Sequence, residues 1–341
     1  MRTTIFNRIA AAVLGTLLSA GAGSTMAADI EERTIKYAVI YDLAHPQGLG
    51  AQKFADLVGQ RSGGKIKVKL YPSGTLGGEV AVISSIQGGI IEMSAMATSQ
   101  LVGLDKDFAA LDLPFLFRDE KEVDAVVDAP IGRKFLDKLP EKGLIGLAWF
   151  EHGFRNLTNS RRPVTKLEDI QGLKIRVEQN PVAIDTFKAL GANAVPMPFP
   201  ELYTALETGA VEGQENPYSA IESSKLYEVQ EYLSVTKHKY TPLILLLSKK
   251  FWDRLSDDEK KILQDAANEA AVYQRKVNRE LNEKFLQSLK SAMQVSEISA
   301  PEMDRLRAKV QPVVDKYTQQ VNESLVKELY AEIEKFRKSK N

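Results

Sequence analysis

The segment Gly172-Leu173-Lys174-Ile175-Arg176-Val177-Glu178 alternates strictly between apolar and charged side chains. Such alternation is typical of a β-strand, because successive side chains point to opposite faces of a sheet. The apolar face is expected to pack on a core, and the charged face, with Arg176 at its centre, to meet water or a ligand. A half-buried strand with a solvated charged face has the same pattern. Its function therefore has to be judged from the other blocks of the chain.

Several blocks on either side of this strand point to one family. They are Leu76-Gly77-Gly78-Glu79, Leu113-Pro114-Phe115-Leu116-Phe117, Gly153-Phe154-Arg155, Glu201-Leu202-Tyr203-Thr204-Ala205-Leu206 and Gly213-Gln214-Glu215-Asn216-Pro217. With the strand around Arg176, they occur in the order found in the solute-binding proteins of tripartite ATP-independent periplasmic (TRAP) transporters. The chain resembles this DctP-like family over nearly its whole mature length. Several ordered blocks are far more specific than any one of them.

The resemblance implies an α/β fold of two lobes, like type II periplasmic binding proteins, with a ligand cleft between the lobes and a long helix bridging them. It implies that Arg176 pairs with the carboxylate of a small organic acid, that Arg155 adds a second contact, and that Asn216 hydrogen-bonds across the cleft. It also implies that the acid is delivered to TRAP membrane permease subunits. Arginine suits the first role chemically, because its guanidinium forms two parallel hydrogen bonds with a carboxylate and stays charged at physiological pH.

Residues 1–27 have the three parts of a secretory signal peptide. Arg2 and Arg8 make a basic start, residues 9–18 form an apolar run, and small residues around Ala27 suit cleavage. The apolar run is shorter than the ~20 residues of a spanning helix, which favours a cleaved signal over a membrane anchor. The sequence therefore predicts a periplasmic protein.

Composition excludes several classes of function. Residues 1–27 hold two of the 45 basic residues and none of the 45 acidic ones, so the remaining chain has a net charge near −2 and no electrostatic footprint for nucleic acid. The chain has no cysteine, which excludes disulfides and thiolate chemistry. The three histidines have no metal-ligand spacing. The GxxxxGK match at 59–65 lacks the following Ser or Thr and runs from a helix into a strand, so we expect neither metal nor cofactor.

The first half of the chain alternates strands and helices. Strands are predicted at 34–41, 66–71 and 91–95, with helices at 51–62 and 79–87, a pattern that favours a mainly parallel sheet covered on both faces. Ligands collect at the carboxyl ends of such strands. The polar residues at those ends, which are equally suited to turns and caps, are His45, Gln47, Glu79 and Thr98.

Trp149 is a further candidate. It ends the apolar strand predicted at 143–150 and lies close in sequence to Arg155. An aromatic residue in this position is more often part of a core than of a ligand site. We keep both interpretations open.

The second half repeats the strand and helix alternation, which implies a second sheet. The apolar run 241–248 predicts a strand buried on both faces. From Ser256, which has capping-box spacing to Glu259, a helical pattern continues for some ~35 residues, or ~50 Å, more than the width of one lobe. A last amphipathic helix is predicted at 301–338. We therefore expect lobe I to contain 28–152 and 242–281, and lobe II to contain 153–241 and 282–341.

The ligand stays open between a C4-dicarboxylate, a 2-keto acid and a hydroxylated sugar acid such as a uronate. If Glu79 faces the cleft, it disfavours a second carboxylate and favours a hydroxylated monocarboxylate. Two other functions remain: a periplasmic enzyme that clamps an anionic substrate between Arg176 and Arg155, and a ligand sensor for a membrane kinase. No GxSxG elbow or other catalytic constellation supports the enzyme.

Overall fold

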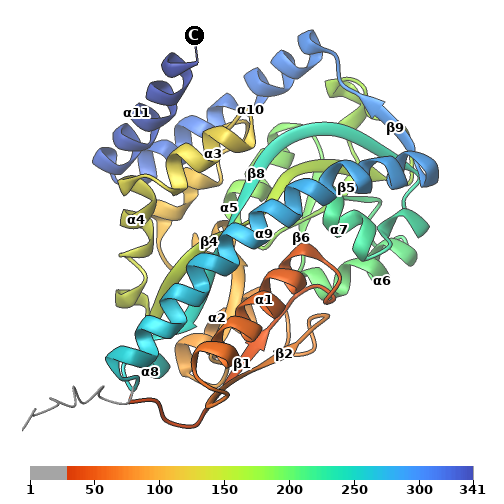
Figure 1. Cartoon of the computed structure of the whole chain (residues 1–341). Coiled ribbons are helices and arrows are strands. Elements are labelled where there is room, and N and C mark those ends of the chain that lie inside the picture. Colours follow the sequence, from red (N-terminus) through yellow and green to blue (C-terminus); the bar gives the residue numbers. More distant parts are fainter. Residues whose placement is uncertain (1–28, 341) are drawn as a thin grey trace, which may run out of the picture.

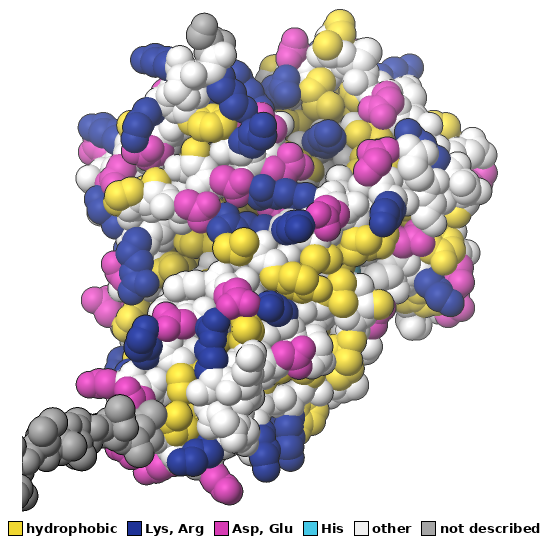
Figure 2. All heavy atoms as spheres, viewed as in Figure 1, with side chains coloured by type: hydrophobic (Ala, Val, Ile, Leu, Met, Phe, Trp, Pro, Cys, Tyr) yellow, Lys and Arg dark blue, Asp and Glu magenta, His cyan; other side chains and the backbone are white. Residues whose placement is uncertain are grey.

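The computed structural model describes residues 29–340. The predicted signal peptide at 1–27 lies outside the described residues. Within 29–340, no helix combines the length and the apolar character needed to cross a membrane. Figure 2 shows acidic and basic side chains interspersed over the face drawn there, in keeping with the near-neutral composition.

One sheet of nine strands runs through the described part of the chain (Figure 1). Its order is β2-β1-β3-β8-β4-β7-β5-β6, and β9 pairs with β8. The strands are β1 (Arg33–Ala38), β2 (Ile66–Tyr71), β3 (Met93–Ala97), β4 (Leu144–Asn159), β5 (Lys174–Val177), β6 (Asn193–Pro196), β7 (Gly213–Asn216), β8 (Tyr232–Ser248) and β9 (Gln294–Glu297). We call β1 to β3 the first end of the sheet and β5 to β7 the second end.

The sequence predicted a separate second sheet, and this was wrong. Strands β4 and β8 have 16 and 17 residues and pair antiparallel, so they join the two ends into one sheet. The predicted strand ended at Phe150, and the second lobe was predicted to begin at Gly153. Gly153 has a φ of +108°, but it lies at a bulge within β4. Bulges bend a strand and increase its twist without ending it.

At the first end, two helices follow the strands. Helix α1 spans Pro46–Arg61 and α2 spans Glu79–Gly88, and β2 and α2 lie where the sequence predicted them. Helix α1 begins five residues earlier than predicted, because His45 caps it and residues 46–48 form its first turn. The Nδ1 atom of His45 accepts a hydrogen bond from the backbone N–H of Gln47 at 3.0 Å, and proline is well suited to the first helical position.

At the second end lie α5 (Pro181–Ala189), α6 (Leu202–Glu207) and α7 (Tyr218–Ser223). The charged face of β5 was predicted to meet water or a ligand, and the structure excludes water for two of its residues: Arg176 is 1% exposed and Glu178, which follows the strand, is 5% exposed. The reason is position, since β5 is flanked by β6 and β7 in the sheet. Strands inside a parallel sheet are covered on both faces.

Helix α9 (Asp257–Ala292) is the predicted long helix, with 36 residues and the predicted capping box between Ser256 and Glu259. It packs against α1 at the first end, against β4 in the middle and against α7 at the second end (Figure 1). It therefore braces both ends of the sheet, as expected. The predicted terminal helix 301–338 is two helices, α10 (Ala300–Gln320) and α11 (Glu323–Ser339), because the chain breaks at Asn322, which caps α11.

The remaining helices are α3 (Glu120–Val127), α4 (Pro130–Leu136) and the short α8 (Lys249–Trp252), and α11 packs on α3. Buried apolar residues form separate clusters at the first end, around α1, and at the second end, around α5. A larger cluster lies between them and includes Tyr41, Phe199 and Tyr218. The division of the chain into lobes at the predicted boundaries stays a prediction.

Candidate functional site

Arg176, on β5, is a buried arginine without a paired carboxylate in the described part of the chain. Its Nε and Nη2 atoms donate to the carbonyl oxygen of Met197 at 2.9 and 2.6 Å. Its Cζ atom lies 5.8 Å from the ring centre of Phe199. A buried charge is costly unless it is paired. A ligand carboxylate at this guanidinium would supply the missing pairing, and this contact stays a prediction.

Arg155, on β4, is held by residues of β7. Its Nε atom lies 2.5 Å from Glu215 Oε2, and its Nη2 atom donates to Glu215 Oε1 at 2.8 Å and to Asn216 Oδ1 at 3.1 Å. The register that pairs β4 with β7 antiparallel places Asn156 opposite Asn216, which brings these neighbours together. Most donors of Arg155 are thus committed within the protein. A direct contact between Arg155 and a ligand stays a prediction.

A second layer of buried charges supports the two arginines. Glu178 accepts hydrogen bonds from Lys239 Nζ at 2.7 Å and from Ser99 Oγ at 3.1 Å, and it lies 3.7 Å from Arg155 Nη1. Lys239 also pairs with Asp112 at 2.8 Å, and Asp112 accepts a hydrogen bond from the side chain of Asn180. These contacts fix Glu178 between the two ends of the sheet.

The paired charges control the protonation of these carboxyl groups. Burial by itself raises the pKa of Glu215, but Arg155 and His238 outweigh it and lower that pKa to about 2. The pKa of Glu178 is likewise lowered, because Arg155 and Lys239 outweigh its burial. Burial raises the pKa of Asp112 to about 6, against the opposing charge of Lys239. Glu178 and Glu215 are therefore ionised at neutral pH and hold Arg155 in place.

Sequence analysis missed most of this supporting layer. It consists of Asp112, Glu178, Glu215, His238 and Lys239, all at least 95% buried. Glu215 was within a quoted block and Glu178 within the opening strand, so a family signal was present for these two. Lys239 and His238 lie on β8, far along the chain from Asp112 and Glu215, and meet these two residues only in the folded structure.

An aromatic cluster lies beside Arg176, with Tyr41 and His45 from the first end of the sheet, His152 from β4 and Phe199 from the second end. The ring of Tyr41 stacks on His45 with the ring centres 4.1 Å apart, and it lies 5.1 Å from His152 and 4.6 Å from Phe199. Burial raises the pKa of the Tyr41 phenol, and the charges of Arg155 and Arg176 act on it in the opposite direction. A row of contacts thus leads from His45 through Tyr41 and Phe199 to Arg176.

Several buried polar atoms in this region have no hydrogen-bond partner among residues 29–340. They are His45 Nε2, His152 Nε2 and Thr98 Oγ1. Burial lowers the pKa of His45 to about 3 and lowers the pKa of His152 well below its ordinary value, so both imidazoles are neutral at physiological pH. Unpaired neutral polar groups suit the hydroxyl groups of a ligand.

The other predicted site residues have mixed positions. Glu79 bridges the two ends, because its Oε2 atom accepts a hydrogen bond from the backbone N–H of Phe199 at 3.1 Å. Asn216 donates to Gln214 at 2.5 Å and accepts from Arg155. Gln47 is buried in the first turn of α1. Trp149 belongs to the same apolar cluster as Tyr41 and also lines a depression between α4 and α9. Ligand contact by each stays a prediction.

The described residues contain no group of three His, Asp or Glu side chains arranged to hold a metal ion. The site combines one buried guanidinium, buried neutral polar groups without partners and aromatic rings. Guanidinium groups suit carboxylates, and neutral polar groups suit hydroxyls.

Known proteins resemble this chain over most of its length. Residues 38–320 match the profile of the bacterial extracellular solute-binding proteins of family 7, DctP. The 2,3-diketo-L-gulonate-binding periplasmic protein YiaO of Escherichia coli K12 is 38% identical over 276 residues, which are 81% of this chain and 84% of that protein.

Two solved structures are similar in sequence and fold. One is the sugar acid binding protein DctPAm of Advenella mimigardefordensis in complex with galactonate, with a TM-score of 0.88 and 46% identity over 90% of this chain and 99% of that one. The other is a TRAP periplasmic solute-binding protein of Polaromonas sp. JS666 bound to D-erythronate, with a TM-score of 0.84 and 38% identity over 87% and 98% of the two chains.

Proposed function

This chain belongs to family 7 of the bacterial extracellular solute-binding proteins, the DctP family, and we propose that it is the periplasmic solute-binding subunit of a TRAP transporter. The observation that supports binding of an organic acid is Arg176, whose buried guanidinium forms no ion pair with any described carboxylate. The partners are then a small carboxylate ligand and the membrane permease subunits of the transporter. The protein binds its ligand without turnover.

The ligand class is a hydroxylated monocarboxylate such as an aldonate or uronate. Neutral His45 and His152 and the hydroxyl of Thr98 offer hydrogen bonds but no second positive charge for a dicarboxylate. The galactonate and D-erythronate complexes of similar proteins support this class. Glu79 contributes less to this selectivity than expected from the sequence, because one oxygen of its carboxylate accepts a hydrogen bond from the backbone N–H of Phe199.

Ligand binding is coupled to closure of the two predicted lobes, 28–152 with 242–281 and 153–241 with 282–341. Contacts between the predicted lobes include the hydrogen bonds from Phe199 N–H to Glu79 and from Ser99 to Glu178. A ligand favours the closed state only by as much as it binds that state better than the open one. Closure buries the pair between Arg176 and the carboxylate.

A thermal-shift screen tests the proposal. Galactonate, D-erythronate, glucuronate, succinate and pyruvate are compared on the mature chain. A ligand at 100 times its Kd adds about 2.7 kcal/mol to stability, and we expect the largest shift from a hydroxylated monocarboxylate. Recovery of the bound acid, checked by NMR, should return it unchanged, whereas a new product would support the enzyme instead. A shift from succinate alone would contradict the ligand class.

Glu79→Ala is expected to weaken binding of the acid by about fivefold, or ~1 kcal/mol, because it removes one hydrogen bond that joins the lobes in the closed state. Glu79→Gln keeps a carbonyl acceptor for the Phe199 N–H and is the matched control, with a smaller loss. Calorimetric titration with the best acid from the screen measures both. Equal losses in the two variants would mean that the negative charge acts on the ligand directly.

A further inference from the structure

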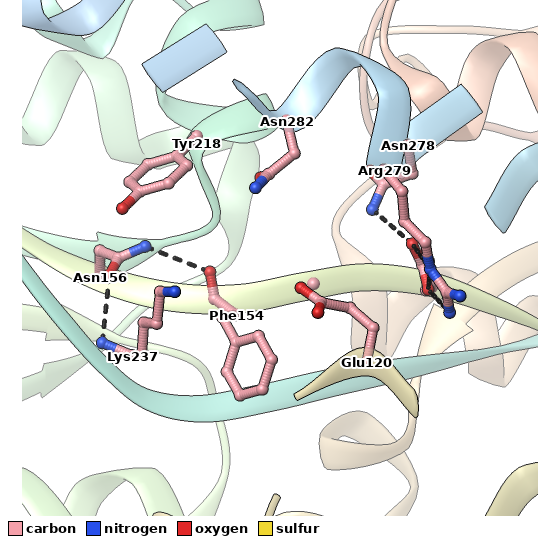
Figure 3. A pocket seen from close by; sticks show the side chains of 10 residues that line it. Glu120, Phe154, Asn156, Tyr218, Lys237, Asn278, Arg279 and Asn282 are labelled. Atoms are coloured by element: carbon pink, nitrogen blue, oxygen red, sulfur yellow. Dashed lines mark hydrogen bonds and ion pairs between the residues drawn. The ribbon is translucent and has the colours of Figure 1, made fainter. Parts of the chain in front are cut away.

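A cavity of about 200 Å³ lies outside the arginine site, between β4, β8, α7, α9 and the start of α3 (Figure 3). At roughly 30 Å³ each, this is room for about six water molecules or a small organic molecule. Tyr218 and Asn282 lie on one side of it, and Lys237 and Glu120 on the other. These elements include both strands that join the two ends of the sheet and the helix that braces them.

Lys237 reaches this cavity because β8 is irregular there. In β8, Ser234 pairs with Leu157 and Lys239 with Arg155, so four residues of β8 oppose the single residue Asn156. The backbone of Lys237 has a φ of +41°, and its N–H donates to Asn156 Oδ1 at 3.1 Å. Irregularities of this kind re-aim side chains. The Lys237 ammonium forms no ion pair with any described carboxylate.

Tyr218 provides the buried part of the site. Its side chain lines the cavity from α7 and is 3% exposed. Its hydroxyl has no hydrogen-bond partner among residues 29–340. A buried hydroxyl without a partner is unfavourable, so a polar atom of a bound molecule beside it would be stabilising. With Lys237, it makes a donor pair suited to a carboxylate.

Glu120 makes the cavity different from a simple anion site. Its carboxylate lines the cavity. Among residues 29–340, this carboxylate has no hydrogen-bond or ion-pair partner. The neighbouring Glu151 is neutralised by Arg279, at 2.6 Å. The cavity thus presents one unpaired cation and one unpaired anion. A molecule with a carboxylate at one end and an ammonium group at the other matches both.

The cavity is next to the residues that hold Arg155. Lys237 is followed directly by His238, whose Nε2 atom lies 3.1 Å from Glu215 Oε2. Glu215 in turn binds Arg155. A molecule that fixes the conformation of β8 at Lys237 therefore acts on the position of His238 and on the strands that must bend when the lobes close.

We propose that this cavity is a second binding site, for a small zwitterion such as a free amino acid, and that its occupation changes the affinity of the arginine site for acid. The effect on acid affinity rests on the proposed function, whereas binding of a zwitterion in the cavity does not. Coupling between two sites is reciprocal, so the acid must change zwitterion binding by the same factor.

The first experiment titrates the acid-free mature chain with glycine, β-alanine and γ-aminobutyrate, and separately with acetate and ethylamine. Up to about 100 mM, where a ligand of millimolar Kd saturates its site, we expect at least one zwitterion to bind, and acetate and ethylamine to bind about tenfold more weakly or not at all. No binding by any zwitterion, or equal binding by acetate, would overturn the site.

Variants locate the binding. We expect tenfold weaker zwitterion binding, roughly, in Lys237→Met and in Tyr218→Phe. Each variant loses one hydrogen bond to a charged or buried group, and such a bond contributes about that factor. Lys338→Met, an exposed lysine on α11, is the matched control and should bind like the parent. Tyr218→Phe removes only an oxygen, so folding is preserved. Unchanged binding in both cavity variants would place the zwitterion elsewhere and refute the assignment.

The coupling is measured by titrating the best acid from the screen with and without saturating zwitterion. We expect a change of several-fold in Kd in the parent chain and none in Lys237→Met. A zwitterion that binds but leaves the Kd of the acid unchanged overturns the coupling. The titration of the acid-free chain reports on the cavity alone, so a failure of the acid-binding function is distinguished from a failure of the second site.

Discussion

Arg176→Ala is expected to weaken acid binding by roughly 2–5 kcal/mol, which is about 30-fold to several thousandfold in Kd. The reason is that the ligand carboxylate is then buried without the guanidinium that pairs with it. Arg176→Lys keeps the charge but loses the planar fork, and should also bind far more weakly than the parent. Calorimetric titration with the best acid from the screen measures each loss.

Arg176→Ala should leave the acid-free protein folded. Arg176 is bonded only to the carbonyl of Met197 among the described residues, so its removal breaks no ion pair. Arg133, which is exposed on α4 and pairs only with Asp137, is the matched control, and Arg133→Ala should bind like the parent. Tight binding retained in Arg176→Ala, with circular dichroism showing a folded chain, would refute the role of this residue.

Glu215→Gln is expected to lower the free energy of unfolding by roughly 3–5 kcal/mol, the effect of breaking a buried ion pair and leaving one partner behind. Glu215 contacts Arg155 through both oxygens and also contacts His238, and all three side chains are buried. Urea denaturation of the acid-free chain at pH 7 measures the loss. The exposed pair of Glu168 and Arg305 is the control, and Glu168→Gln should leave stability almost unchanged, because solvent screens exposed ion pairs.

The stability that Glu215 contributes should depend on pH in a defined direction. The folded-state pKa of Glu215 is about 2, below the ordinary value of 4.5. A carboxyl with a lowered folded pKa stabilises the protein above its unfolded pKa, and this stabilisation is lost as the pH falls from about 4.5 towards 2. The difference in stability between the parent and Glu215→Gln should therefore be full at pH 7 and shrink across this window. A difference that stays constant down to pH 2.5 would contradict the pairing.

A double variant separates the pair from its surroundings. Arg155→Met combined with Glu215→Leu removes both charges, so no buried charge is left without its partner. We expect the double variant to be more stable than the sum of the two single changes implies, since residues in contact are not additive. Additive losses would show that the two side chains contribute independently, despite the short distances between them.

Local features of the sequence determined much of the fold. Strand β2, helix α2 and the capping box of α9 lie as predicted, because alternation, helical periodicity and end signals act within a few residues. The family blocks also singled out Arg176. Its guanidinium is the feature on which the proposed function rests, and the sequence alone was sufficient to name it.

The environment of Arg176 was decided only by the tertiary structure. Its strand lies inside the sheet, and the partners of Arg155 and Glu178 come from β7, β8 and the segment after β3. The same holds for the single continuous sheet, which depends on bulges that let β4 and β8 pass between its ends. Strand neighbours and buried ion pairs join residues far apart along the chain, whereas periodicity and capping depend only on residues close in sequence. The sequence therefore determined the helices, the strands and the key cation, Arg176. Long-range packing determined which groups surround that cation.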